Sequence, residues 1–159
     1  MRFMALLIVP FLIIGCYSGC AKWENPSWEK PSWEDSSSAP PFDVLKNSNC
    51  FRIGGVGIGG LTPPEHIALV KLMDMTDSSQ QLENLFYKGS LTGRLYALLG
   101  LYYIDQSKYE KLSPRLKNVS YEVVFQAGCL FGSKKVSEIV EEIENGNFDV
   151  FLKPTPENI

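Results

Sequence analysis

One apolar run restricts the fold more than any other part of the chain. It covers residues 95–104 and reads LYALLGLYYI, without a charged side chain. A helix that is apolar on all sides must be enclosed by other elements, so this run is predicted to be the central helix of the core, opened by Ser90 or Thr92. Gly100 costs roughly 1 kcal/mol in a helix relative to alanine, which predicts that it admits a close neighbour.

Capping signals predict further helices on both sides of this run. A buried helix is predicted over residues 63–75, with Thr62 and Glu65 as its capping box. A shorter helix is predicted next, with Ser78 and Gln81 as its capping box and Gly89 as its end. Beyond the central run, Asp105 or Ser107 opens another helix.

The two predicted helical pairs resemble each other. Residues 68–72 read ALVKL and residues 97–101 read ALLGL, and each is followed by an Asp/Ser-rich turn and a shorter amphipathic helix. This similarity predicts two stacked helical hairpins of the HEAT or armadillo kind.

A smaller β element is predicted from alternation. Tyr121, Val123 and Phe125 form a more apolar face than Glu122, Val124 and Gln126, which predicts a strand. Phe51 with Ile53 form the apolar face of another short strand, so a two-stranded sheet is predicted. Ser133 is predicted to cap a C-terminal helix that ends at Gly146. The predicted fold class is therefore mainly α with a small β element, in a globular domain over residues 42–153 with a frayed tail at 154–159.

The first residues have the organisation of an export signal. Arg2 precedes an apolar stretch at residues 3–14, too short to cross a bilayer core of about 30 Å, and Ile13-Ile14-Gly15-Cys16 resembles a bacterial lipobox. We therefore expect a signal peptide over residues 1–15 and a palmitate-type lipid anchor on Cys16. Cys20 fits the pattern less well, and cleavage after Ala21 would instead give a soluble secreted protein. No Asp follows Cys16, so an outer-membrane location is expected if the cell has two membranes.

A spacer follows the anchor at residues 16–41. The sequence WENPSWEKPSWEDSS repeats every five residues, and its prolines exclude a regular helix, which favours an extended stalk. Trp23, Trp28 and Trp33 are candidate contacts for a partner or a membrane interface. The alternative is a linker duplicated by slippage.

Cys50 and Cys129 are the remaining cysteines besides Cys20. In an exported chain such a pair favours a disulfide, which would also bring the two predicted strands together. A reactive thiol at Cys129 or Cys50 is the alternative and would need a neighbouring base, for which His66 is the sole histidine.

Composition and motifs exclude several functions. The chain has 15 Lys and Arg against 18 Asp and Glu, so no basic surface for nucleic acid is expected. Gly55, Gly57 and Gly60 match the spacing of a dinucleotide fingerprint, but the next predicted helix begins later, with two prolines that have no N–H to offer. A glycine-rich turn is expected, with no cofactor and no metal site.

The order of several motifs resembles that of a known family. GGVG at residues 54–57, LYALLGL at 95–101, Gly128-Cys129 and Asn145-Gly146 are similar to a family of exported bacterial proteins, often lipoproteins, one branch of which is named after a microcin gene cluster. The resemblance covers residues 51–152 and implies no catalytic residues, because the family has no established activity.

The sequence thus favours a non-catalytic envelope lipoprotein that binds or positions a protein partner from the end of a stalk. The alternatives are a soluble secreted enzyme that uses Cys129 or His66, and a toxin antagonist or immunity-type protein. The expected partners are the membrane, through the anchor, and another protein.

Overall fold

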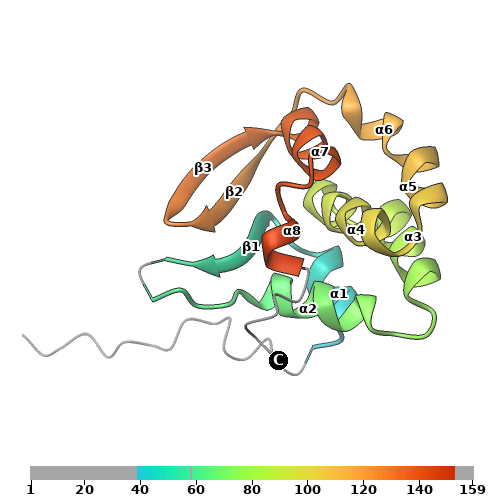
Figure 1. The fold of residues 1–159 in the computed structure, drawn as a ribbon, viewed down its shortest axis with the longest axis horizontal. Coiled ribbons are helices and arrows are strands. Elements are labelled where there is room, and N and C mark those ends of the chain that lie inside the picture. The colour runs from blue at the N-terminus through green and yellow to red at the C-terminus, as the bar shows by residue number, and fades with distance from the viewer. Residues whose placement is uncertain (1–38, 58, 153–159) are drawn as a thin grey trace, which may run out of the picture. The chain divides into compact units, whose positions relative to one another are not determined.

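The described part of the chain is mainly helical with one small sheet, as predicted. The computed structural model describes residues 39–57 and 59–152, which belong to one compact unit (Figure 1). The elements, in chain order, are α1 Pro41–Lys46, β1 Cys50–Val56, α2 Pro64–Met73, α3 Ser78–Lys88, α4 Leu91–Ile104, α5 Gln106–Leu112, α6 Pro114–Lys117, β2 Glu122–Gly128, β3 Leu130–Lys135, α7 Val136–Glu144 and α8 Asp149–Leu152.

Helix α4 is the central helix, as its apolar run predicts. It lies among α3, α5 and α7 in Figure 1, and its residues 95–101 are all buried. Ser90 is its N-cap and accepts a hydrogen bond from the backbone N–H of Gly93 at 3.0 Å, which confirms the predicted start. A Cβ on Gly100 would lie 2.7 Å from Cδ2 of Leu82 in α3, so this glycine does admit a close neighbour.

The capping predictions for the other helices have mixed outcomes. Asp105 caps α5 by accepting from the N–H of Lys108 at 3.1 Å, as predicted. The capping box of Thr62 and Glu65 is wrong, because the N-cap of α2 is Pro63 and no side chain caps it. Ser78 is likewise the first residue of α3, not its cap.

The sheet has three strands in the order β1-β2-β3, so the prediction of two strands is incomplete. β1 pairs with β2 in parallel, with Cys50 opposite Val124, and β2 pairs with β3 in antiparallel. Gly128 has a φ of +58° in the two-residue loop before β3, a conformation that glycine adopts without strain. Ser133 lies in β3, so its predicted capping role is wrong, and α7 begins at Val136.

One face of the sheet packs on the core. The Phe51 ring stacks on Tyr96 at 4.7 Å between centroids, and its centroid lies 5.7 Å from that of Phe148, which follows α7. Phe151 of α8 lies against Gly54 of β1 so closely that a Cβ there would overlap the ring. The segment after α7 thus returns to the core through both phenylalanines, whereas Val150 is 67% exposed.

Some predictions lie outside the described residues. These include the signal peptide, the lipid anchor at Cys16, the three tryptophans of the stalk and the tail at 154–159. The stacking of α2–α3 on α4–α5 as HEAT-like repeats stays a prediction.

Candidate functional site

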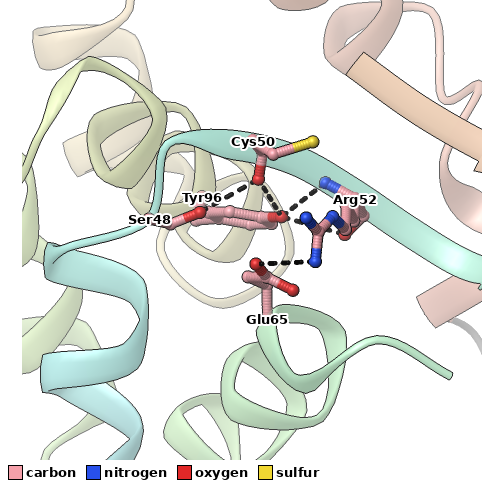
Figure 2. Close-up of polar contacts among 5 residues, drawn as sticks. All are labelled: Ser48, Cys50, Arg52, Glu65 and Tyr96. Carbon is pink, nitrogen blue, oxygen red and sulfur yellow. Dashed lines mark hydrogen bonds and ion pairs between the residues drawn. The ribbon is translucent and has the colours of Figure 1, made fainter. Parts of the chain in front are cut away.

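A network of polar groups closes the free edge of β1 (Figure 2). The backbone N–H of Arg52 donates to the hydroxyl of Tyr96 at 2.6 Å, and that hydroxyl donates to the carbonyl of Arg52 at 2.9 Å, with the carbonyl of Cys50 at 3.3 Å. Ser48 Oγ also donates to the carbonyl of Cys50, at 2.9 Å. Side chains from the helical part thus take the place of another strand, which protects the edge from pairing with other chains.

Arg52 and Glu65 join β1 to α2 on the second face of the sheet. Their closest atoms, Nη1 and Oε1, are 3.5 Å apart, longer than a charge-assisted hydrogen bond. Arg52 Nε and Glu65 Oε2 are buried and have no hydrogen-bond partner among the described residues. Burial disfavours the charge on Arg52, but Glu65 and the neighbouring Cys50 outweigh burial and raise the pKa of the guanidinium. The Glu65 carboxylate therefore holds the Arg52 guanidinium in position through one long contact.

His66 also makes a hydrogen bond at the free edge of β1. Its Nδ1 accepts a hydrogen bond from the backbone N–H of Gly54 at 3.3 Å, and burial lowers the pKa of the imidazole. The interaction requires Nδ1 to be unprotonated, so His66 is held neutral. His66 therefore has a structural role at the edge of β1, which the sequence did not predict.

The predicted disulfide between Cys50 and Cys129 is wrong in this structure. Both thiols are free, and Cys50 is buried whereas Cys129 is exposed. Cys50 lies opposite Val124, so Cys129 is five residues further along the paired strands, or roughly 16 Å at about 3.3 Å per residue. A disulfide requires Cα atoms within about 7 Å of each other. The two strands are neighbours as expected, through their backbone hydrogen bonds and not through a covalent link.

The candidates for nucleophilic chemistry are distributed over different parts of the fold. Cys129 Sγ lies 4.0 Å from the carbonyl oxygen of Gly57, at the loop between β2 and β3, while His66 bonds Gly54. No hydrogen bond joins His66 to either thiol within residues 39–57 and 59–152. A thiol and a base must be in such contact to act together, so the structure does not bring this pair into a working arrangement.

A groove of about 270 Å³ lies where the second face of the sheet meets the loop before α2. Its wall is mostly apolar, with a few polar groups from the strands and the loop. This composition is typical of binding sites for small or extended ligands. The lining residues are Arg52, Val56, Gly57, Leu61, Thr62, Pro63, Pro64 and Gln126.

A second hollow, of about 370 Å³, lies among α4, α5, α6 and α7. Its charged groups already have partners: Lys117 pairs with Glu144 at 2.6 Å, and Glu110 accepts from Gln106 at 3.2 Å. The groove beside the sheet is therefore the better candidate for a binding site.

The glycine-rich segment forms a turn, as expected. Val56 and Leu61 exchange backbone hydrogen bonds of 2.8 and 3.1 Å around it, and Gly57 and Gly60 have positive φ. In the part of the chain that the structure describes, no cluster of three or more His, Cys, Asp or Glu could hold a metal ion. None of the helices described here is long and apolar enough to cross a membrane.

No protein family, curated protein or solved structure shows a match to this chain. The resemblance to exported bacterial lipoproteins stays a prediction.

Sequence reasoning missed the groove because its residues come from separate elements. Arg52 stands between Phe51 and Ile53, and this alternation already placed its side chain on the opposite face from the core. Gln126 belongs to the predicted second strand. Only the parallel register, which puts Arg52 opposite Gln126, brings the two together.

Proposed function

We propose that the protein is an exported, lipid-anchored envelope protein, non-catalytic, which binds or positions another protein. The lipobox at Cys16, the Trp/Pro/Ser-rich spacer and the family resemblance support export and anchoring. The stalk would hold the folded domain away from the membrane, and the two stacked helical pairs would form its rigid scaffold.

The observation that carries the binding role is the surface of the β2–β3 hairpin. Leu130 is 74% exposed, Phe131 is 72% exposed and Tyr121, which precedes β2, is 75% exposed. In Figure 1 the hairpin extends away from the helices, and β3 is an edge strand. Exposed large apolar side chains on an edge hairpin are typical of protein interaction surfaces, and edge strands are common docking sites for extended segments.

Intact mass tests the anchor. Protein purified from membranes is expected to begin at Cys16 and to carry a diacylglycerol or triacyl mass increment, and Cys16→Ser is expected to abolish that increment. Peptide mapping after alkylation of the native protein should find Cys129 modified and Cys50 unmodified, because only Cys129 is exposed. A mature chain without lipid that begins after Ala21 would overturn the anchoring.

Photocrosslinking in the intact cell tests the binding role. A photoreactive amino acid is placed at Leu130, at Phe131 or at Lys88, which is exposed at the end of α3. The proposal expects one discrete crosslinked protein from a hairpin position and none from Lys88. Equal, diffuse labelling from all three positions would contradict it.

A further inference from the structure

Two residues of the groove lining, Arg52 and Gln126, belong to a cross-strand row that ends at Phe131. Arg52 lies opposite Gln126 in the β1–β2 register, and Gln126 lies opposite Phe131 in the β2–β3 register. Directly opposed residues project from the same face of a sheet, so a cation, an amide and an aromatic ring form one cross-strand row. We call these three residues the Arg–Gln–Phe row.

The row faces away from the packed core. Residues alternate between faces along a strand, and Phe51 and Phe125, which adjoin Arg52 and Gln126, are both buried on the core side. α2 covers the β1 end of the second face through Glu65, whereas Phe131 at the other end is exposed. The row therefore runs from a sheltered arginine to an open aromatic ring.

The loop before α2 gives the row an apolar wall. Leu61, Pro63 and Pro64 line the groove together with Arg52 and Gln126, and Leu61 is itself largely exposed. Proline side chains are rigid, so this wall loses little conformational entropy when a ligand binds.

Charge and size indicate what the groove accepts. Arg52 is the one ionisable side chain among the lining residues, and its side chain is 32% exposed. Lys134 does not compete, because it projects from the core side of β3, pairs with Glu142 at 2.7 Å and lies over the ring of Phe125. At about 270 Å³ the groove is near the lower limit for ligand pockets, so it has room for the end of a chain and not for a long segment.

We propose that this groove binds the C-terminal end of a partner protein, with the carboxylate on Arg52, the apolar side chain of the last residue directed along the row toward Phe131, and the residue before it against Leu61. Gln126 bonds the last peptide group, since its amide both donates and accepts. The guanidinium can take the carboxylate because its contact with Glu65 is long, at 3.5 Å, and because the Arg52 side chain is 32% exposed. The inference rests on the protein-binding role proposed above and names its site and the chemistry of the partner.

The test is a titration of the full-length protein, in the detergent that extracts it, followed by ¹³C-methyl NMR. The probe is N-acetyl-Gly-Gly-Leu with a free carboxylate, and its C-terminal amide is the comparison. The free acid is expected to shift the methyl signals of Val56 and Leu61 and to leave those of Leu45 and Leu82 in the core unchanged. The amide should bind at least five-fold more weakly. Equal shifts with both peptides, or none with either, would overturn the proposal.

Two exposed apolar residues give a matched pair of variants. Phe131→Ser is expected to weaken binding of the free acid at least five-fold, because Phe131 belongs to the row. Val150→Ser removes an apolar side chain of similar exposure, 67%, from α8, outside both the hairpin and the groove lining, and should leave binding unchanged. Similar losses in both variants would refute the assignment to the row.

Arg52→Lys tests the carboxylate contact without removing the charge opposite Glu65. Lysine lacks the planar fork of arginine, so binding of the free acid should weaken while the core methyl signals stay in place. If N-acetyl-Glu-Leu-amide binds as well as the free acid, the groove reads an internal carboxylate and the assignment to a chain end is wrong. A crosslink in cells from Leu130 with none from Phe131 would leave the binding role standing and this site refuted.

Discussion

At the scale of single residues, Tyr96 has the largest consequences for the fold. Its hydroxyl satisfies both backbone groups of Arg52, and burial raises its pKa well above the ordinary value. Tyr96→Phe keeps the ring stacked on Phe51 but leaves a buried N–H without a partner, which should lower the free energy of unfolding by about 1–3 kcal/mol. Urea denaturation measures the change.

Tyr102→Phe is the matched control for this variant. The hydroxyl of Tyr102, on the same helix, makes an exposed hydrogen bond of 3.4 Å to the carbonyl of Glu144. Its loss should change the unfolding free energy by no more than about 0.5 kcal/mol. Equal effects of the two substitutions would contradict the role assigned to Tyr96.

His66 should make stability depend on pH. Burial lowers the pKa of the folded imidazole below its ordinary 6.5, so the unfolded chain binds the proton first as the pH falls. The contribution of His66 is therefore complete above about pH 6.5 and is lost as the pH falls through the ordinary value and then through the lower folded one. Between pH 7.5 and 5, the wild-type protein should lose more stability than His66→Gln, as measured by urea denaturation. Parallel pH profiles would contradict this.

At the scale of elements, the contact between α3 and α4 depends on a missing side chain. A methyl group on Gly100 would lie 2.7 and 2.8 Å from the two Cδ atoms of the fully buried Leu82. Such overpacking costs about 1–3 kcal/mol, against a gain of about 1 kcal/mol in helix propensity, so Gly100→Ala should be neutral to moderately destabilising. Leu82→Val shortens this side chain by one methylene and removes both Cδ atoms, which should relieve the overlap.

A double-mutant cycle measures this contact. The unfolding free energy of Gly100→Ala combined with Leu82→Val should be higher than the sum of the single effects predicts, because one substitution makes room for the other. Strict additivity would show that the two residues do not compete for space.

The elements differ in how far the sequence determines them. Helix α4 was predicted because ten apolar residues in succession leave no exposed face. β3 was missed because it lies at the edge of the sheet and is exposed along nearly its whole length, so no burial pattern distinguishes it. The loop of Gly128 and Cys129 between two apolar runs was the available sign of a hairpin.

The predicted cap of α2 was wrong for a local reason. Thr62 does not cap the helix because Pro63 and Pro64 set the backbone at its start and because the Glu65 side chain points toward Arg52.

The candidate site was less predictable than the fold. The row depends on which residue of β1 lies opposite which residue of β2, and about 70 residues separate the strands, so no local pattern contains this information. The cysteine pair shows the same limit. The number of cysteines predicted a disulfide. The strand register instead places Cys129 five residues along the strands from the position opposite Cys50, and both thiols are free.

At the scale of the whole molecule, the end of the described chain packs on its beginning. Phe151 of α8 lies against Gly54 of β1, and the hydroxyl of Tyr103 donates to Asp149 Oδ1 at 2.5 Å. β1 thus has β2 on one edge, Tyr96 and His66 on the other, and the Phe151 ring of α8 against Gly54. We expect β1 and α8 to open together, as one cooperative unit.

Phe151→Ala tests this coupling. The ring is only partly buried, so its loss should cost about 2 kcal/mol, less than the 3–5 kcal/mol of a fully buried phenylalanine. Hydrogen exchange of the Phe51 and Ile53 amides in β1 should accelerate in the variant, although these residues are about 100 positions away in the chain. Val150→Ala is the control, because its side chain is mostly exposed and its removal should cost no more than about 0.5 kcal/mol. Unchanged exchange in β1 would show that α8 frays independently, and the sheet would then derive its stability from α4 and the two polar side chains at its edge.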